Sequence, residues 1–226
     1  MKLLRSVFAP MDQNAYIFVD EDTNECVVLD PGGDEDKLIR AIESNGLILK
    51  AILLTHAHGD HIGALAALKE KFGVPVGIYK DEADVLRSPE LNFTGSFGSP
   101  RIAMEADILF EDGDVYRFGK EGALRVIHVP GHTPGGACYY SEATGQLFSG
   151  DCLFYGSVGR TDFPQYSKKL KAETGVKELG ADGNMALLLK SIQEKLMVLP
   201  DDTRVYPGHG MPTTIGNEKK YNPYLR

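Results

Sequence analysis

The sequence predicts an α/β protein in which two sheets pack face to face between outer helices, a four-layer αββα sandwich. Short apolar runs rich in β-branched and aromatic residues alternate with helical patterns through the first half. The second half opens with a run of strands joined by polar turns and closes with an amphipathic helix and a strand. The order strand, strand, helix recurs loosely in both halves, and each sheet needs a cover for its outer face. We therefore expect residues 1–226 to form one domain.

The first half begins with a predicted hairpin, because a polar turn splits two short apolar runs. A helix follows, in which Leu38, Ile39 and Ile42 recur at helical spacing, with acidic residues in the first turn and Gly46 just beyond the end. The predicted elements of this half are strands 16–19 and 26–29, helix 34–44, strand 51–55, helix 62–72 and strand 76–79.

The second half follows a loop, 88–100, that is rich in Gly, Ser and Pro. Leu188, Ile192 and Leu196 form one apolar stripe, which predicts an amphipathic helix. The predicted elements are strands 115–118, 124–129, 137–140 and 146–149, helix 185–197 and strand 204–206.

Composition and charge exclude several classes of protein. The net charge of -8 disfavours nucleic-acid binding, which requires a cationic face. No run of 18 apolar residues is present and the N-terminus has no signal-peptide pattern, so we expect a cytoplasmic protein without a membrane segment. The three cysteines, Cys26, Cys138 and Cys152, include no Cys-x-x-Cys pair, which fits a reducing compartment and simple packing.

The strongest chemical signal is the segment 55–61, which places His56, His58, Asp60 and His61 at the end of an apolar strand. On a helix, His56 and His58 would point about 200° apart, whereas in an extended segment residues two apart share a face. We therefore predict a loop in which His56 and His58 face one ion. Asp60 and His61 then turn toward a second ion.

Three further candidates each follow a predicted strand and lie beside glycine: His132, Asp151 and His209. Glycine lets the backbone bend sharply and approach an ion closely. Of the six histidines only His128 falls outside this pattern, and we interpret it as structural. Imidazoles and carboxylates without thiolates suit zinc, manganese or iron bound for catalysis.

These motifs together resemble the metallo-β-lactamase superfamily, and most closely its short glyoxalase II-like (hydroxyacylglutathione hydrolase-like) members. The resemblance covers nearly the whole chain. The segments that carry it are His-x-His-x-Asp-His (56–61), Gly-His-Thr-Pro-Gly-Gly (131–136), Ser-Gly-Asp (149–151), Gly-Arg-Thr-Asp-Phe-Pro (159–164), Pro-Gly-His-Gly (207–210), Thr-Ile-Gly-Asn-Glu (214–218) and Asn-Pro (222–223).

The resemblance implies an αββα sandwich and two divalent metal ions, zinc first, with iron or manganese as alternatives. It implies that one ion is held by His56, His58 and His132, that the other is held by Asp60, His61 and His209, and that Asp151 bridges the two. Asp60 would also be catalytic, positioning the attacking hydroxide. Asp30 would orient a metal ligand by a hydrogen bond, or cap the following helix.

The activity implied is hydrolysis of a hydroxyacyl thioester such as lactoylglutathione. Two cations lower the pKa of a shared water from about 15.7 toward about 7, and a thiolate leaves without a strong general acid because thiol pKa values lie near about 8.5. Longer glyoxalase II enzymes have an additional C-terminal helical region that contributes to glutathione binding, and we expect this region to be missing or vestigial here.

The candidate substrate contacts are Arg160 and Tyr155. A guanidinium suits a substrate carboxylate, although an ion pair of Arg160 with Asp162 and simple packing of Tyr155 are the alternatives. Three lysines in the polar segment 165–184 suggest either a solvated face or a lid over an anionic substrate: Lys168, Lys169 and Lys171.

Three other functions stay open. A persulfide dioxygenase would use one iron on His56, His132 and Asp151. A lactonase would use the same metals as the thioesterase. A catalytically silent metal-binding module would keep the fold without turnover. In each enzymatic case the partner is a small molecule, with no nucleic acid or membrane, and the oligomeric state is not predicted.

Overall fold

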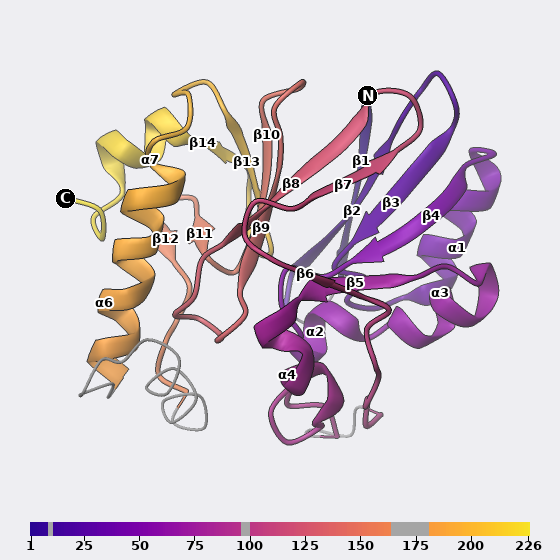
Figure 1. Ribbon diagram of the computed structural model, residues 1–226, viewed down its shortest axis with the longest axis horizontal. Coiled ribbons are helices and arrows are strands. Elements are labelled where there is room, and N and C mark those ends of the chain that lie inside the picture. The colour runs from indigo at the N-terminus through magenta and orange to yellow at the C-terminus, as the bar shows by residue number, and fades with distance from the viewer. Residues whose placement is uncertain (9–10, 96–99, 164–180) are drawn as a thin grey trace.

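The computed structural model describes residues 1–8, 11–95, 100–163 and 181–226, and it has four layers (Figure 1). Two six-stranded sheets lie face to face in the middle of the molecule. Helices α1 (Glu35–Ser44) and α3 (Leu65–Phe72) cover the outer face of the first sheet, and α6 (Ala181–Ser191) and α7 (Ile215–Tyr221) cover the outer face of the second. The predicted αββα sandwich is confirmed.

The first sheet has the order β1-β2-β3-β4-β5-β6. β1, β2 and β3 pair antiparallel, and β3 to β6 pair parallel. The three parallel connections require crossovers, which run through α1, through α2 (Gly59–Ile62) and α3, and through α4 (Ala83–Arg87). The strands are β1 (Lys2–Phe8), β2 (Gln13–Val19), β3 (Glu25–Leu29), β4 (Ile48–Leu53), β5 (Val76–Tyr79) and β6 (Ile108–Phe110).

The helices of this half are α1 (Glu35–Ser44), α2 (Gly59–Ile62), α3 (Leu65–Phe72) and α4 (Ala83–Arg87), with a 3₁₀ turn at Lys80–Glu82. The α1 helix begins where the Asp34 carboxylate accepts a hydrogen bond from the Lys37 backbone N–H. Its residues Leu38 and Ile42 are fully buried against the sheet, as their spacing predicts.

The second sheet has the order β14-β13-β10-β9-β8-β7. All neighbours pair antiparallel except β10 and β13, which pair parallel. Helix α6 (Ala181–Ser191) continues into a π-helical turn (Ile192–Leu196), and α7 (Ile215–Tyr221) follows the sheet. The strands are β7 (Val115–Phe118), β8 (Gly122–His128), β9 (Ala137–Ser141), β10 (Gln146–Gly150), β13 (Arg204–Pro207) and β14 (Thr213–Thr214), with a separate hairpin β11 (Leu153–Phe154) and β12 (Ser157–Val158).

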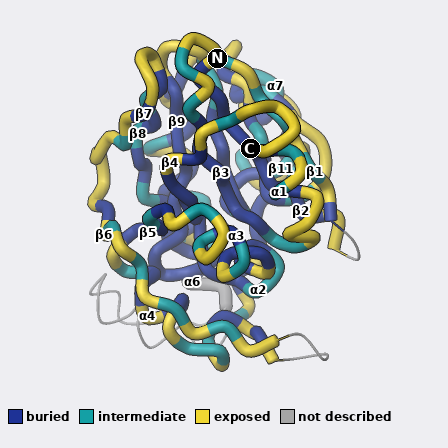
Figure 2. The backbone as a smooth tube through the Cα atoms, turned by 90° about the vertical axis from the view of Figure 1, so that its right-hand side faces the viewer, coloured by how far each residue is buried: buried dark blue, intermediate teal, exposed yellow. Residues whose placement is uncertain are grey.

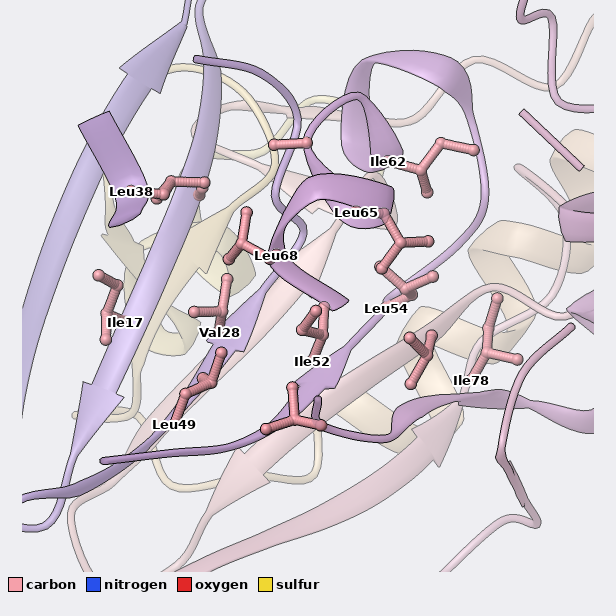
Figure 3. Packing of buried hydrophobic residues seen from close by; sticks show 14 of the residues in the cluster. Ile17, Val28, Leu38, Leu49, Ile52, Leu54, Ile62, Leu65, Leu68 and Ile78 are labelled. Atoms are coloured by element: carbon pink, nitrogen blue, oxygen red, sulfur yellow. The ribbon is translucent and has the colours of Figure 1, made fainter. Parts of the chain in front are cut away.

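Three apolar cores hold the four layers together. The first lies between the first sheet and its helices, and Figure 3 shows Leu38, Leu65 and Leu68 of the helices pointing at strand residues such as Ile52. The second core, which includes Phe18, fills the space between the two sheets. The third packs α6 and α7 on the second sheet. The middle strands are therefore buried on both faces, while most turns at the periphery are exposed (Figure 2).

The structure agrees with most predicted elements but differs at several. The predicted helix 62–72 is α3, which begins later, at Leu65, and a separate short helix, α2, precedes it and ends at Ile62. The sequence analysis did not identify β1, β6, β14, α4, α7 or the β11–β12 hairpin. The lysine-bearing segment with Lys168, Lys169 and Lys171 lies outside the described residues. In the described part of the chain no helix is both long and apolar enough to span a membrane.

Candidate metal centre

The candidate ligands lie in loops that directly follow strands. The segment with His56, His58, Asp60 and His61 follows β4, and the other three candidates, His132, Asp151 and His209, follow β8, β10 and β13. Backbone hydrogen bonds join these loops across the two sheets, from Ala137 N–H to the Thr55 carbonyl at 2.9 Å, for example. Loops on a rigid scaffold are a common position for binding groups.

The first group consists of three imidazoles. His56 Nε2 lies 3.1 Å from His58 Nδ1, and His132 Nε2 lies 3.3 Å from the former and 3.1 Å from the latter. All three side chains are buried. His58 has an extended backbone before the short helix α2, so His56 and His58 share a face as predicted for a non-helical segment.

The second group consists of Asp60, His61 and His209, whose ligand-type atoms lie within 4.8 Å of one another. Asp60 and His61 belong to α2, which turns them away from the first group. His209 Nε2 lies 3.2 Å from Asp60 Oδ2 and 3.4 Å from His61 Nε2. The predicted change of direction after His58 therefore occurs, although as one helical turn.

Asp151 lies between the two groups. Its Oδ1 is 3.4 Å from His61 Nε2, and its Oδ2 is 3.5 Å from His132 Nε2. Oδ1 is buried and has no hydrogen-bond partner among the described residues. Gly208 makes this approach possible, since a Cβ there would lie 2.3 Å from Asp151 Oδ1.

The donor set fits cations. A neutral imidazole carries one N–H, and four rings place their Nδ1–H on acceptors outside the cluster, which leaves four Nε2 lone pairs directed inward beside two carboxylates. These contacts are His132 to the Arg160 carbonyl (2.7 Å), His209 to the Met11 carbonyl (2.9 Å), His61 to Asp30 Oδ2 (3.0 Å) and His56 to Thr55 Oγ1 (3.1 Å), whose own proton is donated to Asp30.

The electrostatics divide the five imidazoles into two kinds. Burial lowers the pKa of His56, His58 and His132, so these rings are neutral and keep a lone pair for a ligand. The carboxylates of Asp151 and Asp60 outweigh burial and raise the pKa of His61 well above its ordinary value, and Asp60 raises that of His209, so these two rings would release a proton on binding a cation.

Burial alone would raise the pKa of Asp151, but the His61 imidazole and its neighbours outweigh burial and lower this pKa to about 2. The Asp60 carboxyl is affected in the same way, chiefly by His61 and His209. Both carboxylates are therefore ionised at neutral pH.

Asp30 supports the cluster from outside. Its carboxylate accepts hydrogen bonds from the Thr55 backbone N–H (2.7 Å), the Thr55 hydroxyl (2.6 Å) and His61 Nδ1 (3.0 Å). The alternative that Asp30 caps the following helix is wrong, because Asp34 caps α1. Asp30 itself has a φ of 49°, a left-handed conformation that Asp adopts more readily than most residues.

Glu82 was not identified from the sequence. It is fully buried, and its carboxylate accepts hydrogen bonds from the Ala57 N–H (3.1 Å) and the Gly135 N–H (2.8 Å). One side chain thus connects the loop that carries His56 and His58 to the loop that carries His132. No local motif marks this role, which depends on a contact between the two halves of the chain.

Phe93 was also missed. It has a φ of 62°, which is unusual for a bulky residue and costs about 1–3 kcal/mol. Its ring lies 5.1 Å from the ring of His58 and 5.4 Å from that of Phe163. The sequence analysis placed it in an ordinary loop.

The predicted substrate contacts do not belong to the cluster. Arg160 donates two hydrogen bonds to the Asp162 carboxylate, at 2.7 and 2.8 Å, so the alternative of an ion pair describes its geometry. Tyr155 is 57% exposed, so packing in the core is wrong for it. It lines a surface hollow of about 410 Å³ with Tyr206 and Asn217. A role of Arg160 or Tyr155 in substrate binding stays a prediction.

The residues interpreted as structural agree with that interpretation. His128 stacks on Tyr79, with ring centroids 4.0 Å apart, and its Nε2 lies 3.0 Å from the Pro134 carbonyl. Cys26, Cys138 and Cys152 are free thiols and buried in the cores, and burial raises the pKa of Cys26 to about 12.

Comparison with known proteins identifies a family whose sequence model matches this chain. A model of the metallo-beta-lactamase superfamily matches residues 9–209. The chain is 38% identical to a probable metallo-hydrolase, YqgX, of Bacillus subtilis, over 100% of this chain and 98% of the relative. It is 36% identical to the hydroxyacylglutathione hydrolase GloC of Haemophilus influenzae, over 94% of this chain and 92% of the relative.

Solved structures agree on the fold. The BLEG-1 B3 metallo-beta-lactamase has a TM-score of 0.84 at 38% identity, with 99% of both chains covered. TTHA1623, solved in a di-iron-bound form, has a TM-score of 0.79 at 37% identity, covering 98% of this chain and 100% of the other.

Proposed function

Because the chain belongs to the metallo-beta-lactamase superfamily and is a metal-dependent hydrolase of that superfamily, we propose that it is a dinuclear thioesterase of the glyoxalase II type. The substrate proposed is a hydroxyacyl thioester such as lactoylglutathione. The relative named hydroxyacylglutathione hydrolase, which aligns with nearly the whole chain, supports this choice. We also propose a cytoplasmic location and a small-molecule partner, without nucleic acid or membrane.

The observation that carries the proposal is the convergence of five imidazoles and two ionised carboxylates, from loops of both sheets, into two adjoining groups with Asp151 between them. His56, His58 and His132 would hold one cation, Asp60, His61 and His209 would hold the other, and Asp151 would contact both. Such cations supply Lewis acidity, which lowers the pKa of water and polarises a carbonyl. Zinc is the metal that this donor set suits first, and iron or manganese also accept it.

The residues of the chain orient the reactants. Asp60 is 28% exposed at its side chain, so its ionised carboxylate reaches from the cluster toward solvent and can accept a hydrogen bond from the attacking water. The water loses a proton to solvent, its oxygen attacks the thioester carbonyl carbon and the C–S bond breaks, which gives a carboxylic acid and a thiolate. A thiolate is stable enough to leave without a protonated side chain beside it.

A second candidate is a persulfide dioxygenase with one iron on His56, His132 and Asp151. Two observations favour keeping it: a similar solved structure contains iron, and His132 Nε2 lies within 3.5 Å of a ligand-type atom of each of the other two residues. The two candidates differ in metal stoichiometry and in their need for oxygen.

The test combines metal analysis of the purified protein with a panel of lactoylglutathione, a lactone, a β-lactam and glutathione persulfide. Two metal ions per chain and release of free thiol from lactoylglutathione are expected. Protein without stoichiometric metal contradicts the metal centre. One iron per chain, together with oxygen uptake on glutathione persulfide, favours the dioxygenase. A metal-loaded protein that hydrolyses or oxidises none of these substrates corresponds to the catalytically silent module.

The role of Asp60 is tested by Asp60→Asn. We expect kcat/KM to fall by about 10²–10⁴-fold, the range typical of a lost acid–base group. Asp202→Asn is the matched control, since Asp202 is exposed and belongs to neither group of candidate ligands. Equal activity of Asp60→Asn and the parent excludes the role.

A further inference from the structure

Two phenylalanines border the first group of candidate ligands from two different parts of the chain. Phe93 follows α4 and Phe163 follows β12, and their ring centroids lie 5.4 Å apart. The Phe163 ring is 5.0 Å from the His58 ring and 5.5 Å from the His132 ring. Phe93 is 36% exposed, so one side of this pair faces away from the protein interior.

Phe93 is held in its unfavourable backbone conformation by both of its neighbours. Asn92 and Thr94 are buried, and the Asn92 side chain accepts hydrogen bonds from the Thr94 N–H (3.0 Å) and the Thr94 hydroxyl (2.6 Å). Asn92 also donates to the Ile102 carbonyl at 2.9 Å. A left-handed bulky residue persists only where surrounding contacts determine it, and here they do.

The same loop is attached to the metal-ligand segment. The Gly59 N–H donates to the Asn92 carbonyl at 2.8 Å, and Gly59 lies between His58 and Asp60. Phe93 is therefore fixed relative to the candidate ligands rather than placed on an independent loop. A strained, partly exposed aromatic residue anchored in this way resembles the residues that proteins use to contact ligands.

We infer that Phe93 and Phe163 form an apolar subsite that binds the acyl group of the substrate, and that the enzyme prefers 2-hydroxyacyl thioesters whose acyl group carries an apolar or aromatic substituent. This inference rests on the proposed thioesterase function. The acyl side is assigned because a thiol carrier such as glutathione is polar and charged, whereas aromatic rings gain by covering apolar surface.

The surroundings of the Phe163 ring favour a neutral acyl group over a charged one. The Arg160 guanidinium lies over the Phe163 ring at 4.9 Å, but its charge is already paired with Asp162. An acyl group that ends in a carboxylate has to compete with Asp162 for the Arg160 guanidinium. An apolar substituent does not compete for the guanidinium, so the Arg160–Asp162 ion pair stays intact.

The kinetic test uses mandeloylglutathione and lactoylglutathione, which differ only by a phenyl in place of a methyl group. We expect the parent to prefer the mandeloyl ester by about 10-fold or more in kcat/KM, which is the discrimination that an apolar pocket typically provides. In Phe93→Ala the preference should fall below about 3-fold through a higher KM for the mandeloyl ester, with metal content unchanged. Tyr221→Ala, at an exposed aromatic residue of α7, is the control.

A binding test separates the failure of the subsite from the failure of the proposed function. Calorimetry on the metal-loaded protein should give mandelate an affinity about 10-fold above that of lactate, and this requires no thioesterase activity. Equal affinity for the two acids, or a preference that Phe93→Ala keeps, overturns the subsite. Absence of thiol release with the acid preference intact overturns only the thioesterase.

The variants Phe93→Gly and Phe93→Leu distinguish two roles of Phe93: binding of the acyl group and shielding of His58 from solvent. Glycine adopts a φ of 62° without strain, so we expect Phe93→Gly to keep its melting temperature while losing the mandelate preference. Phe93→Leu keeps apolar surface and should keep part of the preference. If the only role of Phe93 is to shield His58 from solvent, both variants should bind less metal, and their rates should fall equally for the mandeloyl and lactoyl esters. That result would contradict the inference.

Discussion

Asp30 illustrates how one residue outside the cluster determines the state of a candidate ligand. By accepting the Nδ1–H of His61 and two hydrogen bonds from Thr55, it holds this ring with Nε2 directed toward Asp151, and Nε2 is the atom that would bind a cation. The same carboxylate thereby orients the loop that begins the metal-ligand segment.

We predict that Asp30→Asn weakens metal binding by about 10–100-fold, the usual effect of removing such a hydrogen bond to a ligand. Competition with a chromophoric chelator measures it, with the exposed Asp202→Asn as the control. An unchanged affinity of Asp30→Asn contradicts the orienting role.

Asp20 provides a prediction for the dependence of stability on pH. Its buried carboxylate accepts hydrogen bonds from the backbone N–H groups of Glu121, Lys120, Asp22 and Thr23. The Glu121 hydrogen bond is the largest cause that lowers the pKa of Asp20, from 3.8 to about 2. A folded-state pKa below the unfolded value stabilises the fold above the unfolded pKa. This contribution is complete above about pH 4 and is lost as the pH falls through the folded pKa near 2.

Urea unfolding of the parent and Asp20→Asn between pH 7 and pH 3 checks this prediction. The difference in free energy of unfolding should stay constant from pH 7 to about pH 5 and shrink below about pH 4. A difference that stays the same down to pH 3 contradicts the assignment.

At the residue scale, the sequence predicted the groups whose chemistry is local. His56 to His61 lie within six positions, so their convergence follows from backbone geometry. Phe93 and Glu82 were not predictable in this way. The role of each depends on a contact with a residue far along the chain, and an isolated Phe or Glu in a loop carries no motif.

At the scale of elements, Glu82 joins two ligand loops, and this yields a stability prediction. Glu82→Ala leaves the Ala57 and Gly135 N–H groups without their acceptor inside the protein. An unpaired buried donor costs about 1–3 kcal/mol, so we expect a loss of about 2–6 kcal/mol in the free energy of unfolding, measured with urea.

Glu82→Gln keeps one carbonyl acceptor and should lose less stability than Glu82→Ala. Metal titration of the same variants should show weaker binding at the group His56, His58 and His132, with the group around Asp60 retained. Equal loss at both groups contradicts a specific link between the two loops.

The elements themselves were predicted where apolar periodicity was strong. The stripe Leu188, Ile192 and Leu196 gave the helix that packs on the second sheet. By contrast, β1 (Lys2–Phe8) is an edge strand with intermediate or exposed residues along most of its length, so its pattern was weak. Short elements such as β11 (Leu153–Phe154) contain too few residues for any periodicity to be visible.

At the scale of the whole molecule, the candidate ligands come from loops of both sheets. His56 to His61 follow the first sheet, and His132, Asp151 and His209 follow the second. Cations held by this set would connect the two halves directly, in addition to the apolar core between the sheets.

Removal of metal should therefore destabilise the entire protein. A ligand present at about 1,000 times its Kd contributes about 4 kcal/mol to the stability of the folded state. We expect treatment with a chelator to lower the melting temperature in thermal unfolding, and restoration of zinc to reverse the change. Identical melting curves contradict a bound metal that links the halves.

The segment that carries His209 is fastened to the first strands of the protein. Tyr16 donates its hydroxyl proton to the Pro207 carbonyl at 2.7 Å, and Asn14 and Arg5 donate to the Gly210 carbonyl at 2.9 and 2.6 Å. These partners are separated by about 190–205 positions, and a ribosome adds about 5–20 residues per second. The N-terminal strands of a nascent chain are therefore synthesised about 10–40 s before His209, and a site that needs His209 can be completed only after that.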